Sequence, residues 1–222
     1  MDWTLAITRN RDALRRIVAA LFALAGLKVG GSVSTLPRHV YHAVLWVLRP
    51  AESAVRRLIT IAAQGLVLKP QPPRAAPAGL VLREGSARVQ AFALLDPLKQ
   101  FDPEAVWDIG EPTLVHVEGS FDPALGFREV PSSLAPINAN LIGLRLNALM
   151  RALDDLPGQA RRLVRWQTRR DLALAENRPV RLSPIRPGPP PGKRHRSRHE
   201  VDDVLRECHG LALDLLNAAD TS

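Results

Sequence analysis

Five arginines surround a tryptophan in the C-terminal half of the chain. Four of them would share one side of a helix, because side chains three and four positions apart lie close together. Guanidinium groups donate hydrogen bonds in pairs to phosphate oxygens. The cluster therefore predicts a nucleic-acid-binding surface made of Arg161, Arg162, Arg165, Trp166, Arg169 and Arg170.

A second interpretation of this cluster is a solvated helix face whose counter-charges come from the acidic residues of 79–130. No zinc finger, aromatic RNA-recognition motif or KH loop accompanies the cluster, so we expect no sequence-specific readout. The basic tract 193–196 would add only a non-specific contact.

The six histidines and the single cysteine offer weak metal chemistry. His39 and His42 stand three residues apart and could face the same way, but no third ligand is near them in the sequence. A second combination would be His195, His199, Cys208 and His209, although Cys208 falls in an apolar stripe. We expect no metal and no cofactor, and we interpret Cys208 as a buried apolar residue.

No catalytic motif is present in the sequence. Serine never occurs as G-x-S-x-G, and the phosphate-binding and dinucleotide-binding glycine patterns are missing. The acidic residues do not gather on any predicted helix face. We therefore expect a protein that is not an enzyme and has no small-molecule substrate.

The composition favours helices and a reducing compartment. The 222 residues include 46% hydrophobic residues, 19 prolines and one tyrosine, which is poor material for large sheets. One cysteine excludes an internal disulfide. Arginine dominates the basic residues, as in GC-rich coding, and we expect a bacterial, cytoplasmic protein.

The net charge of +8 is divided into blocks of alternating sign. Residues 1–69 and 131–200 are basic, whereas residues 70–130 and 201–222 are acidic. The basic blocks could attract an anionic partner such as nucleic acid or a membrane surface, or they could be neutralised by the acidic blocks of the same chain.

Three helices are predicted in the N-terminal region. The first covers 9–27 and ends at glycines. The second runs from Thr35 to Leu48, where we expect Pro50 to stop it. The third covers 51–65, with Arg56 and Arg57 on its solvent side.

The apolar run at 17–27 also permits a membrane hypothesis. Eleven residues are too few to span a bilayer, and extension over 17–36 includes Lys28 and three glycines. A buried core helix is one interpretation, and inner-membrane association through residues 17–36 is the other.

The middle of the chain has the composition of an irregular segment. Residues 69–78 are rich in proline, and the acidic stretch that follows carries repeated Asp-Pro pairs and one short strand-like run at 114–117. We expect partial disorder there.

Helical spacing returns in the C-terminal region. Apolar residues from Ile142 to Leu156 form a seam, and Asp155 is placed to cap a new helix with Pro157 in its first turn. After a proline-rich stretch that we expect to bury nothing, the last helix carries an apolar face that must dock on this chain or on a partner. The docking residues of that face are Val201, Val204, Leu205, Cys208, Leu211 and Leu215.

The sequence thus predicts an all-α protein with small helical regions at both ends and an irregular, proline-rich, acidic middle. The predicted divisions are a basic helical region (1–68), a linker and acidic segment (69–135), an arginine-rich helical region (136–182), a basic linker (183–199) and an amphipathic helix (200–222). We expect a non-enzymatic adaptor that docks through apolar helix faces onto another protein or its own N-terminal region. The alternatives are non-specific nucleic-acid binding through the arginine-rich helix and membrane attachment through the N-terminal helix.

Overall fold

A computed structural model describes residues 3–31, 34–68, 90–97 and 132–220. This part of the chain contains five helices and one short two-stranded sheet, so the predicted all-α class is confirmed. The expected strand at 114–117, and most of the segment expected to be disordered, lie outside the described residues. The helices are α1 (Trp3–Leu24), α2 (Arg38–Ala63), α4 (Asn140–Asp154), α5 (Leu156–Ala175) and α6 (Glu200–Asp220).

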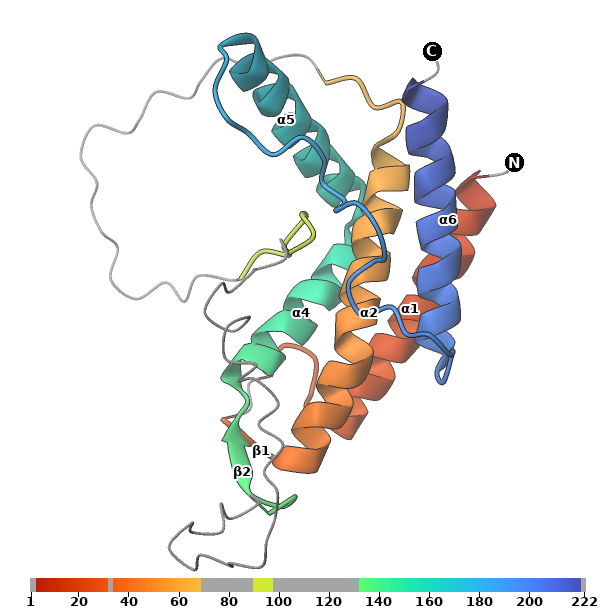
Figure 1. Cartoon of the computed structure of the whole chain (residues 1–222). Helices are drawn as coiled ribbons and strands as arrows, with labels where there is room; N and C mark the ends of the chain where they lie inside the picture. The colour runs from red at the N-terminus through yellow and green to blue at the C-terminus, as the bar shows by residue number, and fades with distance from the viewer. Residues whose placement is uncertain (1–2, 32–33, 69–89, 98–131, 221–222) are drawn as a thin grey trace, which may run out of the picture.

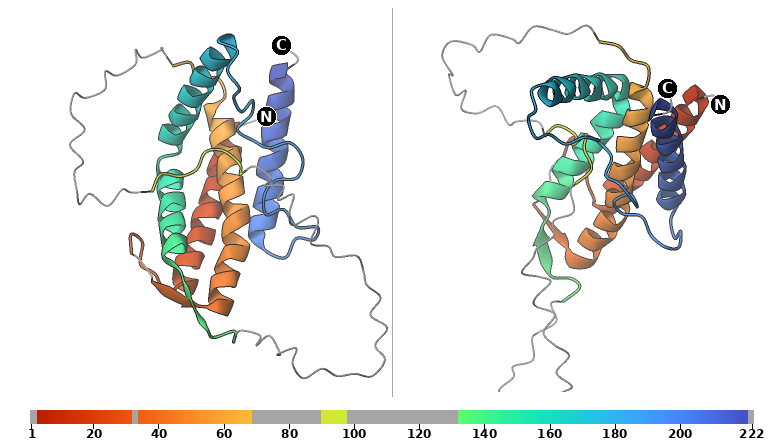
Figure 2. Two further views of the ribbon diagram at one scale, coloured as in Figure 1. Left: turned by 60° about the vertical axis from the view of Figure 1, so that its left-hand side comes forward. Right: turned by 45° about the horizontal axis from the view of Figure 1, so that its top comes forward.

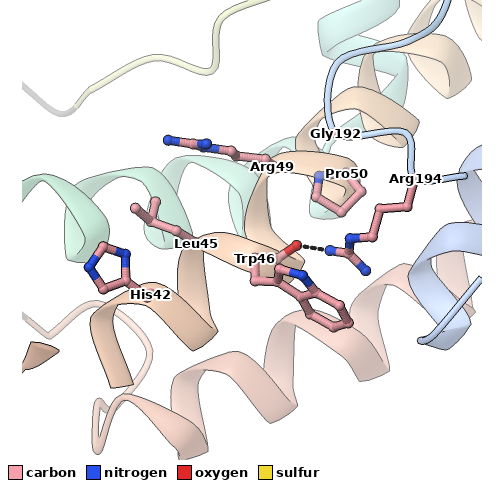
Figure 3. Close-up of a pocket in the computed structure, with 7 residues that line it drawn as sticks. All are labelled: His42, Leu45, Trp46, Arg49, Pro50, Gly192 and Arg194. Atoms are coloured by element: carbon pink, nitrogen blue, oxygen red, sulfur yellow. Dashed lines mark hydrogen bonds between the residues drawn. The ribbon is translucent and has the colours of Figure 1, made fainter. Parts of the chain in front are cut away.

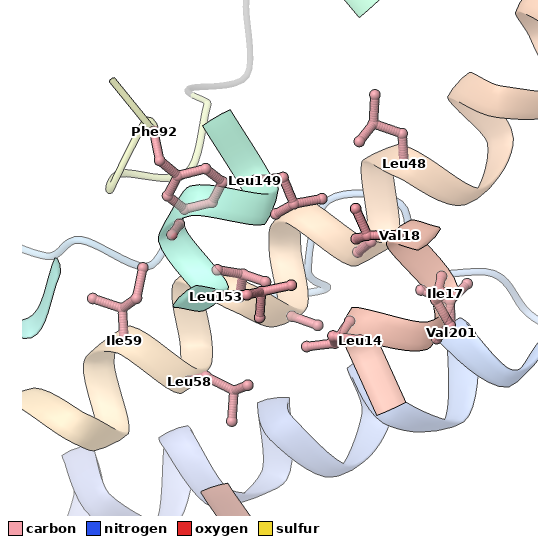
Figure 4. Close-up of a cluster of buried hydrophobic side chains, with 14 of the residues drawn as sticks. Leu14, Ile17, Val18, Leu48, Leu58, Ile59, Phe92, Leu149, Leu153 and Val201 are labelled. Carbon is pink, nitrogen blue, oxygen red and sulfur yellow. The ribbon is translucent and has the colours of Figure 1, made fainter. Parts of the chain in front are cut away.

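Helix α2 is the centre of the fold. It packs against α1, α4, α5 and α6, while α1 also contacts α4 and α6 (Figure 1). Their buried side chains form one hydrophobic cluster that draws on both ends of the chain (Figure 4). The N-terminal and C-terminal helical regions therefore share a single core.

A small sheet closes the end of the helical layer where α2 and α4 begin. Strand β1 (Thr35–Pro37) pairs antiparallel with β2 (Pro136–Asn138), with Leu36 opposite Ile137. The backbone N–H of Arg38 continues the pairing by donating to the carbonyl of Ala135 at 2.9 Å. The starts of α2 and α4 are thereby joined.

Helix α1 begins earlier than the sequence predicts and ends close to the expected glycine. Gly26 adopts a φ of 64°, and the N–H of Leu27 reaches back to the carbonyl of Phe22 at 2.9 Å, which closes the helix end. The apolar side of α1, including Leu14, Val18 and Leu21, is buried in the core. In the described residues, no helix combines the length and the apolar character needed to cross a membrane.

The prediction that Pro50 separates two helices is wrong. Helix α2 continues through Pro50 without interruption. A proline inside a helix leaves the carbonyl four residues earlier without its donor. That carbonyl belongs to Trp46, and it accepts a hydrogen bond from the side chain of Arg194 instead.

The predicted helix start at Asp155 is confirmed. The Asp155 carboxylate accepts a hydrogen bond from the N–H of Gly158 at 3.0 Å, and Pro157 occupies the first turn of α5. The cap separates α4 from α5, and the axis of α5 runs in a different direction from that of α4 (Figure 1).

The expectation that residues 183–198 bury nothing is also wrong. Pro184, Ile185 and Pro190 are buried, and the segment passes along α2 before α6 begins (Figure 2). Its backbone is held by polar contacts, such as the N–H of Asp96 donating to the carbonyl of Pro184 at 2.9 Å. Proline content predicted a solvated linker, but rigid, extended chain also packs well in a groove between helices.

Arg56 and Arg57 do not lie on a solvent side of α2. Arg57 is 0% exposed and Arg56 is 7% exposed, because α6 and residues 90–97 cover this part of the helix. Their partner Asp96 is fully buried as well. The sequence pattern of one helix could not reveal a partner that lies 39 residues away.

Candidate functional site

A hollow on the surface lies between the first half of α2 and residues 192–198 (Figure 3). Two adjoining hollows, of about 310 Å³ and 340 Å³, are both lined by Trp46 and Arg194. We call the combined feature the Trp46 groove. Its lining residues are His42, Leu45, Trp46, Arg49, Pro50, Gly192, Arg194, His195, Arg196 and Arg198.

The α2 wall of the groove follows from helical spacing. His42, Leu45, Trp46 and Arg49 stand at intervals of three, one and three residues, which places them on one face of the helix. His42 and Arg49 are exposed, and Trp46 is 42% exposed. This helix therefore contributes both an aromatic ring and a cation to the lining of the groove.

The opposite wall is fixed to α2 through Arg194. Its guanidinium donates to the Trp46 carbonyl that Pro50 leaves free, and its carbon lies 3.3 Å from the centroid of the Trp46 ring (Figure 3). A cation at such a distance from an aromatic face is electrostatically favourable. Pro50 thus creates the acceptor that holds the wall in place.

Gly192 allows the wall to approach α2 closely. It has a φ of 82°, and an added Cβ would lie 2.7 Å from the backbone nitrogen of Pro50. No side chain fits in that space. Only glycine at position 192 therefore permits this contact with Pro50.

Asp202 completes the support from the first turn of α6. One of its carboxylate oxygens accepts from Arg194 Nη1 at 2.9 Å and from the N–H of Arg198 at 3.0 Å. Asp202 is 7% exposed, so its charge lies behind the wall. The ring of His199 meets the Trp46 ring edge to face, with 6.3 Å between the two centroids.

The groove has an excess of positive charge. No acidic residue is among the described residues that line it. Arg49, Arg196 and Arg198 are exposed and have no ion-pair partner within the described ranges. Three guanidinium groups are consequently available to an anion beside an exposed indole.

The arginine row predicted on α5 divides into two groups. Arg161, Arg165 and Arg169 are exposed and form no ion pair with the described part of the chain. Arg162 donates to the carbonyl of Phe92, and Arg170 lies over the Trp166 ring and pairs with Asp171 at 2.7 Å. Only three of the six residues of this predicted site are therefore exposed together on the surface.

The apolar face predicted for docking lies in the core of this chain. Helix α6 packs it against α2 and α1. Leu215 is partly buried, and the other five residues are at most 7% exposed: Val201, Val204, Leu205, Cys208 and Leu211. In this fold the face is covered from within the molecule.

In the described part of the chain, the histidines and Cys208 considered as metal ligands do not gather into a group of three. No group of three metal-ligating side chains occurs in the described residues. His39 faces the carbonyl of Ser133 at 3.0 Å, and His209 Nδ1 accepts from Arg57 at 3.2 Å. Burial raises the pKa of the Cys208 thiol to about 12, which makes it a poor nucleophile.

From the sequence, no role was assigned to Trp46, and only a non-specific contact was expected from residues 193–196. The missed signal was the spacing of Trp46 and Pro50, which leaves one helical carbonyl open to a distant arginine. The tertiary fold determines which arginine donates a hydrogen bond to that carbonyl.

Comparisons with known proteins were made against family models, curated proteins and solved structures, and none of the three found a match.

Proposed function

We propose that this chain is a non-enzymatic protein that binds single-stranded nucleic acid through the Trp46 groove. The observation that carries the proposal is a set of three exposed arginines in a groove with an exposed indole. Among the described residues, these arginines have no ion-pair partner and no acid lines the groove. Single-strand binding proteins combine a cationic groove for phosphates with aromatic rings that contact bases.

The dimensions of the groove favour a flexible strand. Each hollow is small, and Trp46 lines both of them. A single strand can turn a base toward Trp46 while its phosphates reach Arg49 on one side and Arg196 and Arg198 on the other. A duplex keeps its bases stacked inside and could use only the phosphate contacts.

We expect the binding to be insensitive to base sequence. Arginine side chains at the rim contact phosphates, which are the same in every nucleotide, and an aromatic face accepts any base. The arginine row on α5 is a second candidate for phosphate contacts, and its exposed members Arg161, Arg165 and Arg169 supply the same number of charges.

The test compares two triple variants by fluorescence anisotropy with a labelled oligothymidine over a range of salt concentrations. One variant is Arg49→Ala, Arg196→Ala and Arg198→Ala, and the matched control is Arg161→Ala, Arg165→Ala and Arg169→Ala. Loss of three phosphate contacts should reduce the slope of log K against log salt by about 2. We expect this change in the groove variant and a preserved slope in the α5 variant.

Three results decide the matter. An unmodified chain that does not bind the oligothymidine at low salt overturns the proposal. A slope that changes only in the α5 variant moves the site to that helix and also overturns it. A weaker affinity after Trp46→Leu, without a change of slope, would support the base contact.

A further inference from the structure

Residues 90–97 lie against the core as an extended peptide would lie in a binding groove. The segment has no regular secondary structure and passes the junction of α4 and α5 on its way to α2 (Figure 2). Phe92 and Asp96, four residues apart, are buried, while Ala91 and Ala93 are exposed. Two side chains therefore anchor the segment.

Four arginines from different elements donate to its backbone carbonyls. Arg151 of α4 bonds to the carbonyl of Gln90 at 2.9 Å, and Arg162 of α5 bonds to that of Phe92 at 3.4 Å. Arg56 of α2 bonds to the carbonyl of Ala93 at 3.0 Å, and Arg181 bonds to that of Asp96. We call these four residues, together with Arg57, the arginine cradle.

Contacts to backbone carbonyls hold an extended chain without reading its side chains. The specificity of the cradle comes from its two ends. At one end Phe92 points toward α4, and its ring lies 5.7 Å from the guanidinium carbon of Arg56 (Figure 4). That end selects an aromatic residue by burial and by a cation–π contact.

At the other end the cradle requires a carboxylate. Arg57 is fully buried, and its two terminal nitrogens meet the two oxygens of Asp96 at 3.3 Å and 2.9 Å. Arg56 lies 3.5 Å from the same carboxylate. A buried guanidinium without a counter-ion is strongly unfavourable, so an occupant that lacks an acid at this position is rejected.

Other acids do not meet this requirement in the described structure. Glu52 is engaged by Arg145, with bonds of 2.8 Å and 2.9 Å, and lies 3.7 Å from Arg56. The ion pairs of Arg57 involve Asp96 alone among the described residues. Among the described residues, the carboxylate that the cradle requires is therefore supplied by its occupant.

The segment does not fill the space that holds it. A hollow of about 490 Å³ remains beside Gln90, Ala91 and Phe92, and it is bordered by residues of α4 and α5 such as Arg151 and Arg162. The small side chain of Ala91 leaves this volume open. A peptide with a larger side chain in place of Ala91 would pack better against the same wall.

We infer that the arginine cradle is a recognition site for an extended segment of a partner protein. That segment carries an aromatic residue, a carboxylate four residues later, and a bulky side chain just before the aromatic residue. Residues 90–97 occupy the cradle from within the chain and compete with the partner. The inference is independent of the Trp46 groove, because the two sites share no residue.

The test uses the full chain and labelled peptides with the sequence of residues 90–97. The protein variant Phe92→Ala and Asp96→Ala removes the internal competitor's anchors, and its fold is checked by circular dichroism. By fluorescence anisotropy, the natural peptide should bind this variant at least about tenfold more tightly than it binds the unmodified chain. A peptide with Ala91→Leu should bind more tightly still.

The matched control is a peptide with Phe92→Ala and Asp96→Ala. If the natural and control peptides bind the folded double variant equally, the inference is overturned. If the double variant does not fold, recovery of its helical signal on adding the natural peptide, but not the control peptide, supports the inference. If neither peptide restores the helical signal, a second variant is used to compare the binding of the two peptides.

That second variant is Phe92→Ala alone, which keeps the Arg57–Asp96 pair. Its binding of the natural peptide must again exceed that of the control peptide, and equal binding overturns the inference. Light scattering on the unmodified chain adds a further check. A dimer that is lost in either variant would identify a second copy of the chain as the occupant and would overturn the assignment to a partner protein.

Discussion

Asp96 and Arg57 form an ion pair whose side chains are both completely excluded from solvent, with 2.9 Å between Oδ2 and Nη2. The pair joins residues 90–97 to the central helix. Arg57 also donates to the side chain and backbone of Ser53 and to His209 on α6. One guanidinium therefore connects three parts of the fold.

Replacing Asp96→Ala should destabilise the fold by about 3–5 kcal/mol, because it leaves a buried charge without its partner. Urea denaturation followed by circular dichroism measures this change. The control is Glu176→Ala, which removes the ion pair to Arg178 between two side chains that are more than 60% exposed. Its expected cost is below about 1 kcal/mol, and equal costs for both variants would contradict the assigned burial.

Gly192→Ala should weaken nucleic-acid binding more than Gly188→Ala does. Both glycines have a φ of 82°, so both substitutions carry the same backbone strain. An added Cβ meets the backbone of Pro50 at position 192 and meets nothing within 4 Å at position 188. The difference between the variants, measured by oligothymidine anisotropy, isolates the displacement of the groove wall.

Cys208 should resist alkylation in the folded protein. Burial raises the pKa of its thiol from the ordinary 9.0 to about 12, which reduces the thiolate fraction near neutral pH by about a thousandfold. Iodoacetamide labelling followed by mass spectrometry should be slow in buffer and fast in urea. Rapid labelling of the folded chain would contradict the position of α6 in the core.

His209 should make the protein less stable as the medium becomes mildly acidic. Burial, and then the charges of Arg57 and Lys193, lower the pKa of His209 below its ordinary value of 6.5, with Asp96 acting in the opposite direction. The unfolded chain then binds a proton that the folded chain does not, so the free energy of unfolding falls as the pH drops through 6.5.

The variant His209→Gln keeps an acceptor for Arg57 but does not titrate. Urea denaturation at pH 7.5 and pH 5.5 should show a smaller loss of stability in this variant than in the unmodified chain. Identical losses would mean that the imidazole is equally protonated in the folded and unfolded states.

Periodicity and capping were sufficient to predict much of the helical framework. The apolar stripe after Glu200 predicted α6, and Asp155 with Pro157 predicted the start of α5, because these signals are local. Pro50 misled the prediction, since a proline is tolerated inside a helix when another part of the fold satisfies the carbonyl that it leaves open.

The polar interior was beyond the reach of sequence patterns. Arg56 and Arg57 appear polar in any helical projection, and their burial depends on an aspartate in a segment with no periodicity. The same holds for the Trp46 groove, whose two walls are about 148 residues apart in the chain. The arginine row on α5 follows from helical spacing alone, and three of its members, Arg161, Arg165 and Arg169, lie exposed on one side of that helix as predicted.

The central position of α2 has a consequence for biosynthesis. Its long apolar surface is covered in part by α6, which is translated after the other four helices of the described structure. Until the ribosome has synthesised α6, the part of the α2 surface that α6 buries in the folded protein remains exposed. Nascent chains of this protein should therefore be clients of holding chaperones until translation reaches α6.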